Sequence, residues 1–145
     1  MTASSGRTVT RSRAVDWVVR GLILAVAHIA VRTAAGALTE SAPLHSAAFR
    51  YSGTAIVILV AVAAGVVDGV SRRNRDTVDA YTWVRAAVVC AVVTGVVCSV
   101  LGVLEVSGLA GVSPGVELTS GLAWTFLITM VPAVLGMAVA RRLRG

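Results

Sequence analysis

Lysine is absent from this 145-residue chain, and charged residues of all kinds make up only 14% of it. Aromatic residues reach only 5%, whereas hydrophobic residues account for 57%. A soluble domain has about 25% charged and roughly 45 to 50% apolar residues, so this composition excludes an ordinary soluble fold and points to a membrane protein.

Cysteine is nearly absent as well, with Cys90 and Cys98 the two examples. Eight residues along a helix span about 12 Å, which is too far for a disulfide between them. We interpret both as small packing residues. No Cys/His spacing is typical of zinc or haem binding, so the sequence predicts neither a metal site nor a cofactor.

Long apolar runs dominate what remains. A helix crosses a hydrocarbon core of about 30 Å with roughly 20 residues, and a spanning segment must pair its own backbone amides, which favours helices over strands. Four stretches are long enough: about 15–38, 48–70, 84–104 and 118–140. The sequence therefore predicts an all-α membrane protein, a four-helix transmembrane bundle.

The second stretch is the weakest of the four, because it carries two charges. We expect Arg50 to snorkel outward beside Tyr51, and Asp68 to lie at the opposite interface. Asp68 and Arg72 are spaced i, i+4 and are predicted to pair there, as are Asp16 and Arg20.

Arginine is distributed unevenly between the two sides of the predicted bundle. Eleven of the thirteen arginines fall on one side: Arg7, Arg11, Arg13, Arg20, Arg72, Arg73, Arg75, Arg85, Arg141, Arg142 and Arg144. By the positive-inside rule, both termini and the 71–83 loop are predicted to be cytoplasmic. The net charge of +6 is therefore accounted for without nucleic acid as a partner.

Residues 1–14 are small and polar, and we predict a disordered basic tail attracted to anionic lipid, followed by the transmembrane domain at 15–145. An alternative is that the first apolar run belongs to a cleaved signal peptide. Arg32 interrupts the approach to any cleavage site, which favours a retained helix.

Each predicted helix carries small residues along one face. Such stripes let helices approach closely in lipid, where packing and hydrogen bonds replace the hydrophobic drive. They include Gly21 and Gly36 in the first helix, Gly65 and Gly69 in the second, Gly95 and Gly102 in the third, and Gly121 and Gly136 in the fourth. The pattern predicts one compact bundle.

Two polar residues, His28 and Arg32, share the small-residue face of the first helix. A charge facing lipid at mid-helix costs about 2.5 to 3.5 kcal/mol, so Arg32 should face the bundle or snorkel outward. One interpretation is an intramembrane polar site, in which Thr125 and Thr129 supply hydroxyls and Pro132 frees a carbonyl. The other is structural: Arg32 pairs with Glu40 or Glu117, and His28 bonds a threonine or a carbonyl.

A faint internal repeat is also visible. DWVVRGLILAVAH at 16–28 and TWVRAAVVCAVVT at 82–94 both begin with tryptophan followed closely by arginine. The chain is thus interpretable as two hairpins of one orientation, although any two positive-inside hairpins would share this opening.

Several short motifs resemble a known family. WVVRGL at 17–22, VRTAAGAL at 31–38, VVDG at 66–69, and ELTSG with VPAVLGMAVARR between 117 and 142 look like the bacterial four-transmembrane drug/metabolite transporter-like proteins. The resemblance covers residues 15–142 and implies a multi-pass protein of the bacterial inner membrane with a transport function. The small multidrug exporters of the wider superfamily use a glutamate in the first helix, which this chain lacks.

The predicted function is therefore a small transporter of unknown substrate, expected to be anionic or zwitterionic because His28 and Arg32 would repel a cation. The expected partners are the lipid bilayer and either further copies of the chain or another membrane protein. The alternative is a non-transporting accessory or assembly subunit that docks a partner through its glycine-rich faces. No nucleophile with a base, carboxylate dyad or phosphate loop is present, so an enzyme is not predicted.

Overall fold

Four long helices and three short segments form the part of the chain described by the computed structural model, residues 6–71, 76–106, 109 and 113–143. The long helices are α1 (Gly6–Ser41), α2 (Ser46–Ser71), α3 (Asp76–Val103) and α5 (Leu122–Arg142). The short segments are η1 (Pro43–His45), α4 (Pro114–Val116) and η2 (Glu117–Gly121), the last of which is a π-helical turn.

The four predicted spans are confirmed by length and composition. The apolar helical segments are Asp16–Ser41, Pro43–Val70, Ala80–Val103 and Pro114–Arg142, each long enough to cross a membrane. Their exposed sides are apolar: on α3, Val88, Val92, Val96 and Val100 are exposed at four-residue spacing. That row points away from the buried alanines and cysteines of the same helix, as a helix with one lipid face and one bundle face requires.

The helix boundaries differ from the predicted ones at the starts of the first, third and last spans. α3 begins at Asp76, eight residues before the predicted start and inside the predicted 71–83 loop. α1 begins at Gly6, so residues 6–14 of the predicted disordered tail are helical, and residues 1–5 lie outside the described residues. An established helix adds one hydrogen bond for each further residue, which is how a polar segment continues the helix of an apolar one. The last span begins early, at Pro114, where the Ser113 hydroxyl caps the Val116 amide.

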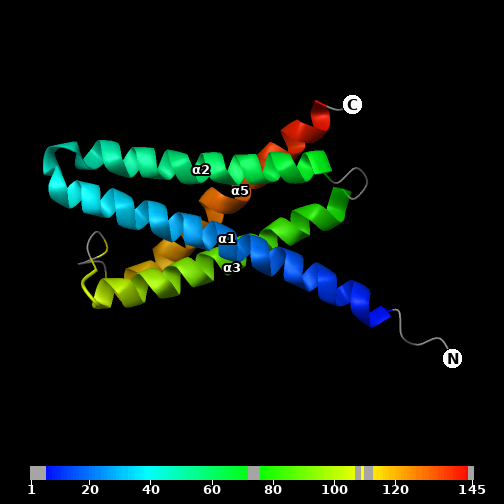
Figure 1. The fold of residues 1–145 in the computed structure, drawn as a ribbon, viewed down its shortest axis with the longest axis horizontal. Helices are drawn as coiled ribbons and strands as arrows, with labels where there is room; N and C mark the ends of the chain where they lie inside the picture. Colours follow the sequence, from blue (N-terminus) through cyan, green and yellow to red (C-terminus); the bar gives the residue numbers. More distant parts are fainter. Residues whose placement is uncertain (1–5, 72–75, 107–108, 110–112, 144–145) are drawn as a thin grey trace.

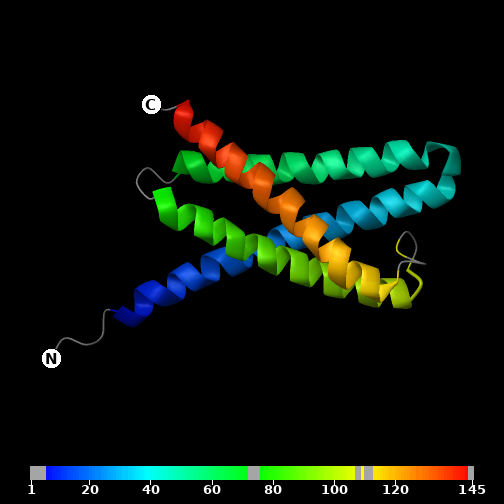
Figure 2. The same ribbon diagram turned by 180° about the vertical axis from the view of Figure 1, so that it is seen from behind.

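The helices are arranged as two crossed hairpins. Figure 1 shows α1 and α2 joined at one end in front of α3 and α5, which approach each other at the same end, and Figure 2 shows the second pair from the other side. The first described residue of α1 and the last of α5 both lie toward the opposite end, at its two far corners. α1 packs on α3 and α2 packs on α5, and within each pair the two helices run in the same direction.

The crossing of α2 and α5 depends on two glycines that make equivalent contacts. A Cβ on Gly65 would overlap the carbonyl oxygen of Ala133, and a Cβ on Gly136 would lie 2.5 Å from that of Val62. Gly136 lies 71 residues beyond Gly65, and Ala133 lies 71 residues beyond Val62. Each helix therefore presents the same positions to the other, which is the signature of a two-fold contact.

The α1–α3 contact is reciprocal as well. The Arg20 guanidinium lies 5.7 Å from the centre of the Trp83 ring, and that of Arg85 lies 5.9 Å from the centre of the Trp17 ring. The tryptophan and arginine of each predicted repeat thus contact those of the other. These paired contacts support the interpretation of the chain as two hairpins of one orientation.

The small residues predicted to allow close packing act within the chain. Gly21 faces the Ala86 carbonyl, Gly69 faces Met137, and Gly95 faces Leu122. The core of the bundle consists of Leu24, Ala25, Trp83, Cys90, Ala133 and Met137. One compact bundle, as predicted, results from these close approaches.

Candidate functional site: a cleft between α1, α2 and α5

Arg32 projects from α1 toward the start of the last span, where it meets Glu117. Its Nη1 donates to Glu117 Oε2 at 2.9 Å, and its Nη2 donates to Oε1. Glu117 is buried and the Arg32 side chain is 28% exposed. Arg32 therefore faces the bundle, and of the two partners considered for it in the structural interpretation, the structure selects Glu117.

The local chain path around Glu117 explains how its carboxylate reaches α1. Glu117 opens the π-helical turn η2, and Gly121 closes it. A Cβ at Gly121 would lie 2.7 Å from Glu117 Oε2, so the glycine leaves the room that the carboxylate occupies. π-Helical turns are rare and occur frequently at functional sites. The ELTSG motif thus coincides with the segment that presents the acid.

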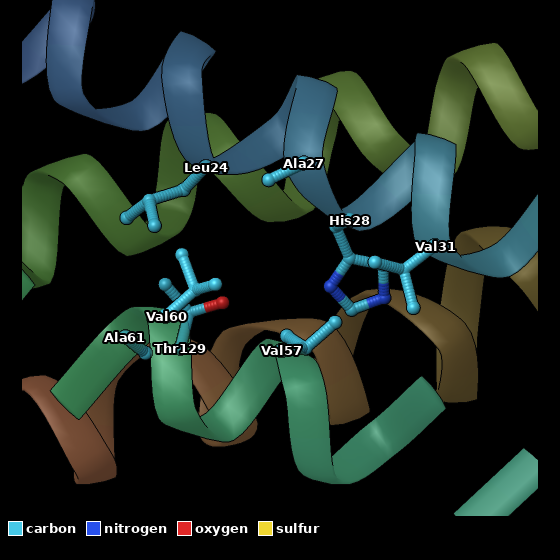
Figure 3. A pocket seen from close by; sticks show the side chains of 8 residues that line it. All are labelled: Leu24, Ala27, His28, Val31, Val57, Val60, Ala61 and Thr129. Carbon is cyan, nitrogen blue, oxygen red and sulfur yellow. The ribbon is translucent and has the colours of Figure 1, made fainter. Parts of the chain in front are cut away.

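His28 lies one helical turn before Arg32 and is 4% exposed. Its Nδ1 is buried without a hydrogen-bond partner among the described residues. Figure 3 shows the imidazole entering the space between α1 and α2 near Val31 and Val57, while Thr129 enters from α5. A buried ring nitrogen without a protein partner is available to a water molecule or a ligand.

The narrow space beside His28, which we call the small pocket, has room for about one water molecule. Its volume is about 10 Å³, and its other lining residues, Leu24, Ala27, Val31, Val57, Val60 and Ala61, are apolar. His28 and Thr129 are its two polar side chains. The small pocket is therefore too small for a solute.

A much larger open space, which we call the large cleft, shares His28, Val31 and Val57 with the small pocket. Its volume is about 500 Å³, within the range of roughly 300 to 1,000 Å³ that is common for small-molecule sites. Its lining comes from α1 (His28, Val31, Arg32, Ala35, Gly36, Thr39, Glu40), α2 (Arg50, Gly53, Thr54, Val57) and α5 (Trp124, Ile128). From His28 to Glu40 it follows α1 for about 18 Å.

The structure brings together only part of the predicted polar site. His28 and Arg32 line the large cleft, and His28 shares the small pocket with Thr129. Thr129 also lies 3.8 Å from the sulfur of Cys90. Thr125 is buried and Pro132 half-buried in α5, and neither lines the cleft or the small pocket.

Sequence reasoning missed Arg50 as a residue of this site. Arg50 is exposed, as expected for a side chain that snorkels outward beside Tyr51, and it also lines the large cleft with Gly53, Thr54 and Val57. These four positions follow the i, i+3, i+4, i+7 pattern of one helix face. That spacing was visible in the sequence. It could indicate a cleft only once α1 was known to lie opposite this face of α2.

A second charged cluster, at the end of the bundle that holds the described helix termini, was predicted with other partners. Arg20 donates to Asp68 through Nη1 at 2.5 Å and through Nη2 at 2.8 Å. Trp83 Nε1 donates to Asp68 Oδ2 at 3.0 Å. The cluster joins α1, α2 and α3, whereas the predicted partner Arg72 lies outside the described residues.

Neither a scan against protein-family models nor a search of curated proteins finds a match to this chain. The likeness to drug/metabolite transporter-like proteins therefore stays a prediction from short motifs. The fold and the composition define the class: the chain is a multi-pass membrane protein with four candidate spans.

Proposed function

We propose that this protein is a small transporter and that the large cleft is its solute-binding site. The observation that carries the proposal is the cleft itself, a space of about 500 Å³ among spanning helices. Its size suits a small molecule, and its lining combines apolar side chains with the polar side chains of His28, Arg32 and Glu40.

The two ends of the bundle differ, as a transporter caught in one state requires. The cleft lies toward the end where each hairpin turns. At the other end, hydrogen bonds to Asp68 from Arg20 and Trp83 connect α1, α2 and α3. In transporters built from two repeats, rocking of one repeat against the other closes the open end and opens the closed end. A cleft at one end and interhelical contacts at the other fit one state of such a cycle.

Orientation follows from the arginine distribution. We propose a bacterial inner-membrane protein with both termini in the cytoplasm, so that the cleft opens to the outside. In a homo-oligomer, helices of neighbouring copies would line the transport pathway together with these four helices. The proposal does not include enzymatic activity.

Two glycines proposed as docking positions in the accessory-subunit alternative are covered within the chain. Gly65 and Gly95, expected to meet a partner, contact Ala133 and Leu122 of the same chain. A partner would have to bind elsewhere.

A cleft-filling variant tests the proposal. Purified protein is reconstituted into liposomes, and charge displacement is recorded with panels of organic acids and amino acids. Ala35→Trp places an indole in the cleft and should reduce the solute-dependent current at least about ten-fold, because bound solute and indole compete for one space. Ala30→Trp, on an exposed position of the same helix, is the matched control and should keep the current. Equal currents in the two variants, or none from the unaltered protein, would contradict transport through this cleft.

A further inference from the structure

The large cleft passes along α1 from an exposed end to a buried one. Glu40 and Arg50 are exposed lining residues of opposite charge, and water can hydrate both. Arg32 lies further along α1, and both carboxylate oxygens of Glu117 match its charge. His28 ends the α1 lining and is 4% exposed. The polar group at the buried end of the cleft is therefore an imidazole.

The imidazole of His28 borders two spaces, because it lines both the small pocket and the large cleft. Figure 3 shows one ring nitrogen directed toward the Thr129 hydroxyl and the other on the side of Val31. Nδ1 is buried and has no hydrogen-bond partner among the described residues, which places it in the narrow small pocket. Nε2 is then the nitrogen on the side of Val31 and the cleft.

The small pocket determines which ring nitrogen carries the proton. Its volume of about 10 Å³ fits one water molecule between Nδ1 and the Thr129 hydroxyl. Thr129 Oγ1 also lies 3.8 Å from Cys90 Sγ, and either atom can donate in that contact. Whichever of them donates, the water keeps a hydrogen for Nδ1. A neutral imidazole that accepts at Nδ1 has its proton on Nε2, so a donor is presented to the cleft.

A donor at the buried end of the cleft is matched by an acceptor on the ligand. Arg32, one helical turn away, lines the same cleft, and its side chain is 28% exposed. Glu117 accepts from two of its nitrogens, Nη1 and Nη2, and a guanidinium has five N–H groups in all. Donors from His28 and Arg32 thus favour a carboxylate or carbonyl oxygen over an ammonium group, which has donors and no acceptor.

We infer that His28 is the solute-binding residue at the buried end of the large cleft. A water molecule in the small pocket joins Nδ1 to Thr129, and Nε2 donates to a carboxylate or carbonyl oxygen of the solute. Thr129 is a positioning residue, because it acts on the solute through the imidazole. The inference rests on the proposed function and names the chemical group of the solute that reaches deepest into the cleft.

Three probes that share a phenyl ring test the inference. Benzoate, benzamide and benzylammonium are titrated by calorimetry against the full chain in a neutral detergent. The first two carry an acceptor oxygen and should bind, and benzylammonium should bind at least about ten-fold more weakly. His28→Ala should weaken binding of benzoate and benzamide about five- to ten-fold, the scale of one hydrogen bond, and leave benzylammonium unchanged. Equal affinity for the three probes would overturn the inference.

Two amide variants test which ring nitrogen meets the solute. The amide of glutamine extends about as far as Nε2, and that of asparagine about as far as Nδ1. His28→Gln should therefore keep the benzoate affinity within about three-fold of the unaltered protein, whereas His28→Asn should lose as much as His28→Ala. A cooperative thermal transition shows that each variant is folded. Equal affinities of the two amide variants would contradict the assignment of Nε2 to the solute.

The role of Thr129 is tested with a variant that keeps its shape. Thr129→Val removes the hydroxyl and should weaken benzoate binding about three-fold. Thr125→Val is the matched control, because Thr125 is equally buried but lines neither space, and it should change nothing.

The position of the ring proton can be observed directly. The chain has two histidines, so His45→Gln leaves His28 as its one imidazole. The nitrogen NMR spectrum of that imidazole should show the proton on Nε2, and adding Thr129→Val should give a mixture of the two tautomers. A proton on Nδ1 in the protein with Thr129 intact would overturn the inference.

Failure of the inference and failure of the proposed function are distinguishable. Benzoate binding that depends on His28, without any current from the organic acids in liposomes, would overturn transport alone. An organic-acid current that is unchanged in His28→Asn would overturn the inference alone.

Discussion

Arg32 and Glu117 form an ion pair inside the bundle, and each is costly there without the other. Sequence reasoning identified Arg32 as unusual and named Glu117 as one of two partners. It could not choose between Glu40 and Glu117, because the choice depends on the η2 turn, which Gly121 makes possible. Thr125 was placed in the site because it shares a helix face with Thr129, but sharing a face does not fix depth relative to α1.

Removing one partner of the pair should be more harmful than removing both. Glu117→Ala leaves the Arg32 charge uncompensated and should lower the free energy of unfolding by about 3 to 5 kcal/mol. The double variant Arg32→Ala/Glu117→Ala should be more stable than Glu117→Ala alone by about 1 kcal/mol or more, because it leaves no charge unpaired. Unfolding in mixed detergent micelles measures all four proteins. Additive losses would show that the two side chains are not coupled.

At the scale of helices, apolar length predicted all four spans and small-residue spacing predicted close packing. The sequence did not predict which small-residue faces pack against each other. The pairing of α2 with α5, rather than with its neighbour α3, comes from the crossing of two hairpins and has no local signal. The helical extension of α1 back to Gly6 was likewise missed, because polar composition was interpreted as disorder.

The α2–α5 crossing can be tested at Gly65. A methyl group there would overlap the Ala133 carbonyl, so Gly65→Ala should force the helices apart and destabilise the bundle by about 1 to 3 kcal/mol. Gly115→Ala is the matched control, because a Cβ at Gly115 meets nothing within 4 Å and alanine favours a helix. Thermal unfolding of the two variants should differ clearly, and equal stability would contradict the close crossing.

At the scale of the whole molecule, the two hairpins are related by reciprocal contacts, yet the polar groups are distributed unequally between them. His28 and Arg32 belong to α1, and the cleft lies beside the first hairpin. Sequence reasoning detected the repeat at its tryptophans and arginines, and interpreted the chain from it as two hairpins of one orientation. The sequence could not predict the cleft, because the cleft depends on how α1, α2 and α5 are placed relative to one another.

The central claim is that water and solutes enter between α1, α2 and α5 from the side opposite the termini. Single cysteines at Ala35, in the cleft, and at Ala30, on the exposed face of α1, test it directly in a Cys90→Ala/Cys98→Ala background. In intact cells, a membrane-impermeant thiol reagent applied from outside should label position 35 and spare position 30, because only the cleft is wet. Labelling of neither position, or of position 35 only from the cytoplasmic side, would contradict the account.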